Sequence, residues 1–183
     1  AWALESALKK EPYESHVVEE ISQMLIELSE NSDDTFRHHA IKAFYYLELH
    51  KNTEFHYIII DNRYIGVLTD VIVANAKPKY TIMALKIISG CCICGNDCLE
   101  QIFAFNTINC FSKIINPEDD EHADDEYMET FLDFLINTLV SQCNDMYIYK
   151  IIDCFANQSL ENIFKNHSTY IHIKGTNAIQ RLF

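Results

Sequence analysis

The chain has 183 residues, 49% of them hydrophobic, and a formal net charge of -13. Because contact with nucleic-acid phosphates needs clustered Lys and Arg, this charge argues against a nucleic-acid-binding protein. Only 4 Gly and 3 Pro are present, which disfavours an all-β chain rich in tight turns, and no apolar run reaches the roughly 18 residues of a membrane span.

Helical periodicity runs along the whole sequence, and the β-branched and aromatic stretch Tyr57 to Ile60 is short enough to be helical as well. In chain order, the predicted helices span 1–10, 14–30 (a short and a medium helix), 34–50, 54–60, 63–75, 79–93, 97–104, 106–116, 126–141, 145–153 and 157–166. The segment from His167, which contains Gly175, is the least regular part. It is expected to begin another unit or to act as a cap.

The stretch from Pro78 to Asn116 shows the pattern most clearly. Ile82, Leu85 and Ile88 recur at steps of three, as on a helix that buries one face, and a proline is tolerated in the first helical turn. A polar break at 95–97, with the sequence GND, separates this helix from a shorter one. The stretch therefore reads as one multi-helix unit.

Related positions recur at intervals of 41 to 50 residues. Ile41 aligns with Ile82 and Ala43 with Ala84, 41 residues apart, whereas the pair Asn-Asp at 96–97 recurs at 144–145, 48 residues later. Periods of this length with two or three helices are typical of armadillo and HEAT repeats, and three helices favour armadillo. The predicted fold is all-α: a right-handed α-solenoid of about four armadillo-type (ARM/HEAT-like) three-helix repeats.

We expect a single solenoid domain over residues 1–183. Its predicted units are approximately 1–30, 31–76, 77–117 and 118–166, followed by a C-terminal partial unit or cap at 167–183. Because the end of a solenoid presents apolar surface, a homodimer through one end is an expectation. A compact helical bundle of a viral regulatory type is the alternative architecture, although the repeat period counts against it.

Two segments resemble the armadillo family, and within it the importin-alpha (karyopherin alpha) adaptors that bind nuclear localisation signals. One is Ala-Trp-Ala-Leu at 1–4, and the other is the GND break followed by CLEQIFAFNTI. The resemblance covers roughly residues 1–166. It implies a non-enzymatic nuclear-import adaptor that binds a protein or basic peptide, such as a nuclear localisation signal or a transport factor, on the concave face of its third helices.

In that family the peptide groove uses a Trp on the third helix and an Asn four residues later, so that an indole supports a basic side chain and an amide holds the peptide backbone. The corresponding pairs in this sequence are Trp2 with Ser6, Lys42 with Tyr46, Met83 with Ile87, and Asp133 with Asn137. The ladder is therefore degenerate. Packing between neighbouring units explains Trp2 and Tyr46 equally well.

An acidic run lies between two predicted helices. It consists of Glu118, Asp119, Asp120, Glu121, Asp124, Asp125 and Glu126. A solvated loop is the plainer explanation, because like charges repel one another, and electrostatic capture of a basic partner is the functional one. The run lacks the residue order of a calcium loop.

Four cysteines, Cys91, Cys92, Cys94 and Cys98, are crowded into eight residues. Four thiolates suit a structural zinc site, but so close a spacing makes convergent geometry difficult, and small apolar residues filling a seam between repeats explain them without metal. A small helical zinc protein or enzyme around this cluster is an alternative to the scaffold. His56 and the other scattered histidines have no evident carboxylate or cysteine companion at ligand spacing.

The predicted function is that of a protein-binding scaffold without enzymatic activity and without a cofactor. A generic armadillo or HEAT adaptor unrelated to transport is the alternative within binding proteins. No nucleic-acid or membrane partner is expected. The odd number of cysteines, 7, and the absence of a signal-peptide pattern in AWALESALKK indicate a reducing compartment, so we expect the protein to be cytoplasmic and/or nuclear.

Overall fold

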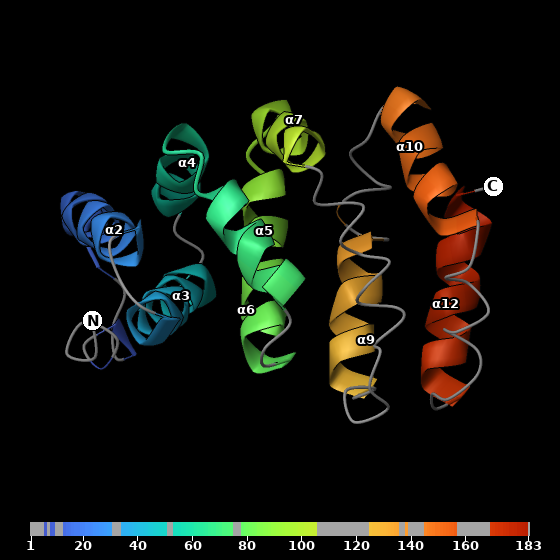
Figure 1. Cartoon of the computed structure of the whole chain (residues 1–183), viewed down its shortest axis with the longest axis horizontal. Helices are drawn as coiled ribbons and strands as arrows, with labels where there is room; N and C mark the ends of the chain where they lie inside the picture. Colours follow the sequence, from blue (N-terminus) through green and yellow to red (C-terminus); the bar gives the residue numbers. More distant parts are fainter. Residues whose placement is uncertain are drawn as a thin grey trace.

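The computed structural model describes residues 6, 8, 9, 13–30, 34–50, 53–74, 78–105, 125–135, 138, 145–156 and 169–182. Every regular element in these ranges is a helix, including the segment around Tyr57, which confirms the all-α prediction. Figure 1 shows the helices following one another along the long axis, with the two termini at opposite ends. None of the helices in these ranges is long and apolar enough to cross a membrane.

The described helices fall close to the predicted positions. Their bounds are α2 Ser15–Glu30, α3 Asp34–Leu49, α4 Thr53–Asp61, α5 Ile65–Ala74, α6 Pro78–Cys92, α7 Asn96–Ala104, α9 Asp125–Asp133, α10 Asp145–Ala156 and α12 Thr169–Leu182. The five predicted helices from 34–50 to 97–104 agree with α3 to α7 within two residues at either end.

Two expectations were wrong. The region 14–30 forms one helix rather than two, because Val18, Ser22, Leu25 and Ser29 recur at steps of three and four and bury a continuous face. The segment after His167 is not irregular, since α12 spans 14 residues of it. The predicted helices at 106–116 and 157–166, and most of that at 1–10, lie outside the described residues, and the unit boundaries stay a prediction.

The helices pack on consecutive helices and on helices two or three elements away in the chain. Helix α3 packs on α2 and α6, α6 packs on α4, α5, α7 and α9, and α9 packs on α12. This succession is the α-solenoid arrangement, in which one unit covers the apolar surface of the next. The helices α3, α6, α9 and α12 form one row (Figure 1). Because α3, α6 and α9 carry the positions that the sequence aligned with the third helices of the armadillo family, we refer to the helices of this row as the third helices.

Aromatic rings fill the core between α3, α4 and α5. The Phe44 ring lies 5.6 Å from Phe55 and 5.0 Å from Tyr64, measured between centroids, and all three side chains are buried. Pairs at such distances contribute about 0.5–1.5 kcal/mol beyond the area they bury. This cluster fixes α3 against α4 and thereby orients the opposite stripe of α3 outward.

Two turns use left-handed backbone. Gly95 connects α6 to α7 with φ of 139°, a conformation that side chains rarely adopt, so the predicted GND break is confirmed as a glycine-dependent turn. Arg63 connects α4 to α5 with φ of 55° and is the non-glycine exception among the described residues. Both turns change the direction of the chain between consecutive helices (Figure 1).

Candidate functional site

The exposed stripes of the third helices form one surface, which we call the third-helix face. On α3 it includes Lys42, Tyr45 and Tyr46, all half-buried, and on α6 it includes exposed Lys79 and half-buried Lys86. These positions recur at steps of three, four and seven, whereas the intervening apolar residues face the core. The same periodicity that builds the core thus aligns long polar and aromatic side chains on one side.

Rings and ammonium groups join α3 to α6. The His38 and Tyr80 rings stack with centroids 3.9 Å apart and planes 2° from parallel. Lys42 Nζ lies 5.9 Å from the Tyr80 centroid, and Lys86 Nζ lies 5.7 Å from that of Tyr45. Each is within cation–π range, so this part of the face is aromatic and basic.

A cleft of about 250 Å³ lies between α6 and the C-terminal end of α9, including Phe134, which follows that helix. It is lined by Leu85, Lys86, Ser89, Thr130, Asp133 and Phe134. Ser89 Oγ lies 2.6 Å from Thr138 Oγ1 and forms a hydrogen bond with it. The cleft therefore combines a largely apolar lining with hydroxyl groups, the Lys86 side chain and one carboxylate at its rim.

Ion pairs join α9 to α12. Lys174 Nζ donates to Glu129 Oε1 at 2.9 Å and to both carboxylate oxygens of Asp133 at 2.8 Å. The Lys174 side chain is 18% exposed and that of Asp133 is 45% exposed, so Asp133 still reaches solvent on the side of the cleft. This part of the face is acidic, with two carboxylates around one ammonium.

The predicted groove residues are only partly assembled on this face. Lys42 and Tyr46 lie on it, and Lys9 Nζ sits 5.2 Å from the Tyr46 centroid. Met83 is 7% exposed and Ile87 is 0% exposed, so neither offers the expected surface to a ligand. The cause is that α6 is surrounded by α3, α4, α5, α7 and α9, which bury even the positions equivalent to Lys42 and Tyr46.

The remaining predicted binding residues are mostly outside the part of the chain that the structure describes. Ser6 is half-buried, and Trp2 and Asn137 lie outside the described residues. In the acidic run, residues 118–124 also lie outside, Asp125 begins α9, and Glu126 is exposed in its first turn. The sequence reasoning missed the contributions of His38, Tyr80 and Lys174, whose only signal is their periodic position on third helices.

The cysteine cluster packs chiefly in the core. Cys91, Cys92 and Cys98 are buried, Cys94 is half-buried, and Cys92 Sγ lies 3.4 Å from Cys98 Sγ. Over the described ranges, no group of three or more His, Cys, Asp or Glu side chains is arranged to hold a metal ion. The expectation that His56 lacks a companion is wrong, because it contacts both Glu48 and Cys94.

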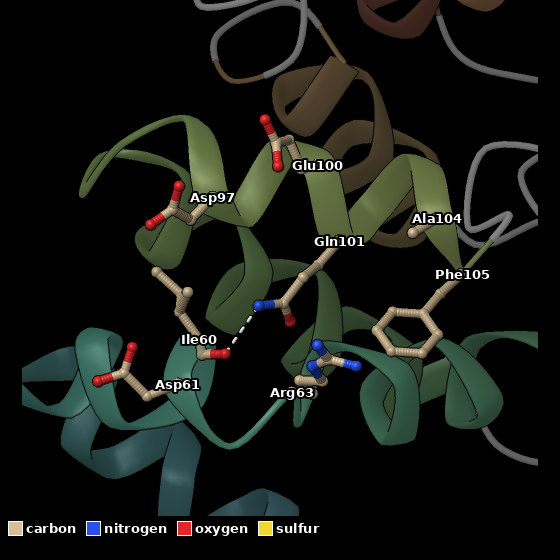
Figure 2. A pocket seen from close by; sticks show the side chains of 8 residues that line it. All are labelled: Ile60, Asp61, Arg63, Asp97, Glu100, Gln101, Ala104 and Phe105. Carbon is tan, nitrogen blue, oxygen red and sulfur yellow. Dashed lines mark hydrogen bonds between the residues drawn. The ribbon is translucent and has the colours of Figure 1, made fainter.

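A larger cavity, of about 420 Å³, opens between the α4–α5 corner and α7 (Figure 2). Asp61 and Arg63 lie at the corner, and Asp97, Glu100 and Phe105 reach it from α7 and its C-terminal end. The Gln101 amide crosses the cavity floor, and its Nε2 donates to the Ile60 carbonyl at 2.7 Å. This bond ties α7 to the end of α4, and the pocket carries more carboxylates than cations.

Comparison with known proteins identifies the fold. No protein-family model matches the chain, and no curated protein matches its sequence. Among solved structures, a computationally designed armadillo repeat protein for modular peptide recognition superposes with a TM-score of 0.70 at 17% identity, covering 97% of this chain and 75% of that one. The fold is therefore an armadillo-type α-solenoid, as the sequence predicted.

Two further designed proteins agree. The designed armadillo repeat protein YIII(Dq)4CqI gives a TM-score of 0.66 at 16% identity and covers 87% of this chain. Another, YIII(Dq.V1)4CPAF, was solved in complex with the peptide (KR)4 and gives 0.59 at 12% identity, covering 99% of this chain and 90% of that one. The chain spans 63% of the length of YIII(Dq)4CqI, less than two thirds.

Proposed function

We propose that the protein is a non-enzymatic scaffold that binds an extended peptide, or an exposed segment of another protein, across its third-helix face. The cleft between α6 and α9 carries this proposal, because it lies between successive third helices and joins apolar walls to a half-exposed carboxylate. The armadillo-type fold supports it as well: one structural neighbour was designed for modular peptide recognition, and another binds (KR)4.

The chemistry of the cleft favours a basic side chain from the ligand. The lining of the cleft is largely apolar, which suits the methylene stem of a Lys or Arg, although Leu85 and Phe134 themselves are buried beneath it. Asp133 lies at the rim where the charged end would arrive. The hydroxyls of Ser89 and Thr130 are within the same lining and suit a peptide backbone. The net charge of -13 adds a long-range attraction for basic ligands.

The finer form of the proposal is an import adaptor, similar to importin-alpha, that takes a basic nuclear localisation signal or a transport factor and works in the cytoplasm and nucleus. It is supported by the resemblance at residues 1–4 and 95–108 and by the acidic rim of α9. We also propose that the protein can form a homodimer through one end of the solenoid.

One observation favours an adaptor unrelated to transport. On the α3 and α6 side, the face carries Lys42, Lys79 and Lys86, which would repel a ligand that is basic throughout its length. Such a surface suits a segment with acidic residues at one end and basic residues at the other. The two versions therefore differ in the charge pattern of the peptide that binds best.

Fluorescence anisotropy with two labelled peptides separates these versions. One peptide is rich in Lys and Arg throughout, and the other has an acidic half followed by a basic half. Import-type binding predicts tighter binding of the fully basic peptide, whereas the unrelated adaptor predicts tighter binding of the mixed one. Titrations at low and moderate salt show how much of either affinity is electrostatic.

The variant Asp133→Asn tests whether the ligand occupies the cleft. We expect it to weaken binding of the preferred peptide about fivefold, equivalent to roughly 1 kcal/mol for a partly exposed charge contact. Asp70→Asn is the matched control, because Asp70 is exposed on α5 and does not line the cleft. Equal affinities for the two variants would remove the cleft from the binding site, and no binding of either peptide would contradict the proposal.

A further inference from the structure

We propose that Cys94 is a chemically reactive modification site, in which the His56 imidazole serves as the base for the thiol and Glu48 orients that imidazole. The three side chains come from three separate parts of the fold: α3, α4 and the turn after α6. This inference is independent of peptide binding.

The geometry places a different partner on each nitrogen of the imidazole. His56 Nε2 is hydrogen-bonded to Glu48 Oε2, and His56 Nδ1 lies 3.6 Å from Cys94 Sγ. A carboxylate can only accept, so Nε2 carries the proton and Nδ1 presents its lone pair to the thiol. The Cys94 S–H therefore donates to His56, which is the arrangement in which an imidazole takes up a thiol proton.

Gly90 makes this arrangement possible. It is buried within α6, where glycine costs roughly 0.5–1 kcal/mol relative to alanine. A methyl group at this position would lie 2.6 Å from the Glu48 carboxylate carbon, too close for any real contact. The missing side chain leaves the space that the carboxylate occupies while it holds His56.

Solvent access distinguishes Cys94 from the other three thiols of the cluster. Cys91, Cys92 and Cys98 are fully buried at 0% exposure, whereas Cys94 is half-buried and reachable from solvent. His56 itself is only 5% exposed, so water does not compete strongly for its ring nitrogens. Among the four thiols of the cluster, Cys94 alone combines solvent access with a hydrogen bond to a base.

The proton remains on sulfur until reaction. Burial, followed by the nearby Cys98 and Glu48, raises the pKa of the Cys94 thiol. The thiolate is therefore scarce at neutral pH, and transfer of the proton to His56 must accompany attack by sulfur. Glu48, a carboxylate on α3, stabilises the imidazolium that forms, and Cys91 on α6 and Cys98 on α7 are the other titratable groups near the thiol.

The reaction with hydrogen peroxide is a balanced example of this chemistry. The Cys94 sulfur attacks one peroxide oxygen, an S–O bond forms and the O–O bond breaks. The thiol proton passes through His56 Nδ1 to the departing hydroxide, which leaves as water. Sulfur is oxidised to a sulfenic acid and the peroxide is reduced.

The experiment treats the folded full chain with hydrogen peroxide at pH 7.5, traps sulfenic acid with dimedone and maps it by peptide mass spectrometry. Among the cysteines of residues 91–98, we expect Cys94 to carry most of the dimedone label. The rate of Cys94 labelling in the folded chain should be at least tenfold higher than in the chain unfolded with guanidinium. Label on the buried cysteines instead, or equal folded and unfolded rates, would overturn the proposal. This comparison needs no variant.

Substitutions test the roles proposed for His56 and Glu48. His56→Gln should slow Cys94 labelling about tenfold or more, as expected for loss of a general base, while His50→Gln should leave it unchanged. His50 is a matched control because its Nε2 contacts the Leu8 carbonyl rather than a thiol. Glu48→Gln, which keeps an acceptor for Nε2–H, should retain more of the rate than Glu48→Leu. Identical rates for the two histidine variants would exclude the base.

Discussion

Two joints between third helices, α3 with α6 and α9 with α12, differ in their chemistry. Between α3 and α6, the contact is a parallel stack of His38 on Tyr80 with Lys42 above the ring. Between α9 and α12, it is the ammonium group of Lys174 between Glu129 and Asp133. The solenoid fold determines which helices are in contact, whereas the identity of the side chains determines the character of each contact. One end of the third-helix face is aromatic and basic, and the other end is acidic.

This difference should appear in how each joint responds to salt. Ring stacking depends little on ionic strength, whereas exposed ion pairs are screened within about 10 Å at 0.1 M salt. Two buried tyrosines pack on the helices of these joints: Tyr64 contacts Phe44 of α3, and Tyr127 of α9 interacts with Thr81 of α6. Three measurements, taken from the largest expected effect to the smallest, test the comparison.

The largest effect is expected at alkaline pH. Burial raises the pKa of Tyr64 to about 12, an increase that Ser29 and Arg37 partly offset. Because the unfolded phenol ionises near 10, the folded state binds the extra proton between pH 10 and 12. The protonated Tyr64 phenol makes its full contribution to the free energy of unfolding below pH 10. That contribution falls by roughly 3 kcal/mol as the pH approaches 12.

Tyr64→Phe should remove that part of the alkaline loss, as measured by urea unfolding at pH 8, 10 and 11.5. Burial also raises the pKa of Tyr127, so Tyr127→Phe should remove a second part. Equal losses in the unmodified chain and in both variants would mean that neither phenol is buried as described.

Tyr80→Ala tests the aromatic joint. Loss of the stack on His38 and of the Lys42 contact should lower the free energy of unfolding by about 2 kcal/mol, with little change between low and high salt. Tyr149→Ala provides the control, because Tyr149 is 69% exposed on α10 and should give almost no change. A strongly salt-dependent loss at Tyr80 would contradict the aromatic character of this joint.

Lys174→Met tests the ionic joint while keeping a long apolar stem. We expect a loss of about 0.5–1 kcal/mol at low salt that largely disappears in 1 M NaCl, since both carboxylates are partly exposed. Lys79→Met, at an exposed position on α6, is the matched substitution. If both lysine variants lose the same stability, the Lys174 ion pairs do not contribute to the joint.

The helices were predictable because each one carries its own local signal. The steps of three from Ile82 to Ile88 locate α6, and the GND sequence marks a turn that depends on Gly95. The single helix α2 was missed because small buried residues such as Ser22 and Ser29 were not read as part of an apolar face. Local patterns therefore identified most of the described helices, but they wrongly divided the region 14–30 into two.

The candidate sites were harder to predict because they depend on neighbours distant in sequence. Repeat alignment put Ile87 on the face together with Tyr46, but it could not show that a helix packed on several sides buries one and not the other. His56 meets Glu48 eight residues away and Cys94 on a third element. The available clue was Gly90, a glycine near the C-terminal end of a predicted apolar helix.

The neighbour-by-neighbour packing of the described helices also has a mechanical consequence. Helices α2 and α3 at one end share no extensive contact with α9 or α12 at the other, so a load applied to the two ends passes through each joint in turn. Small rotations at successive joints add up to a change in length while every local core stays closed. The molecule is thus expected to stretch and recoil like a soft spring.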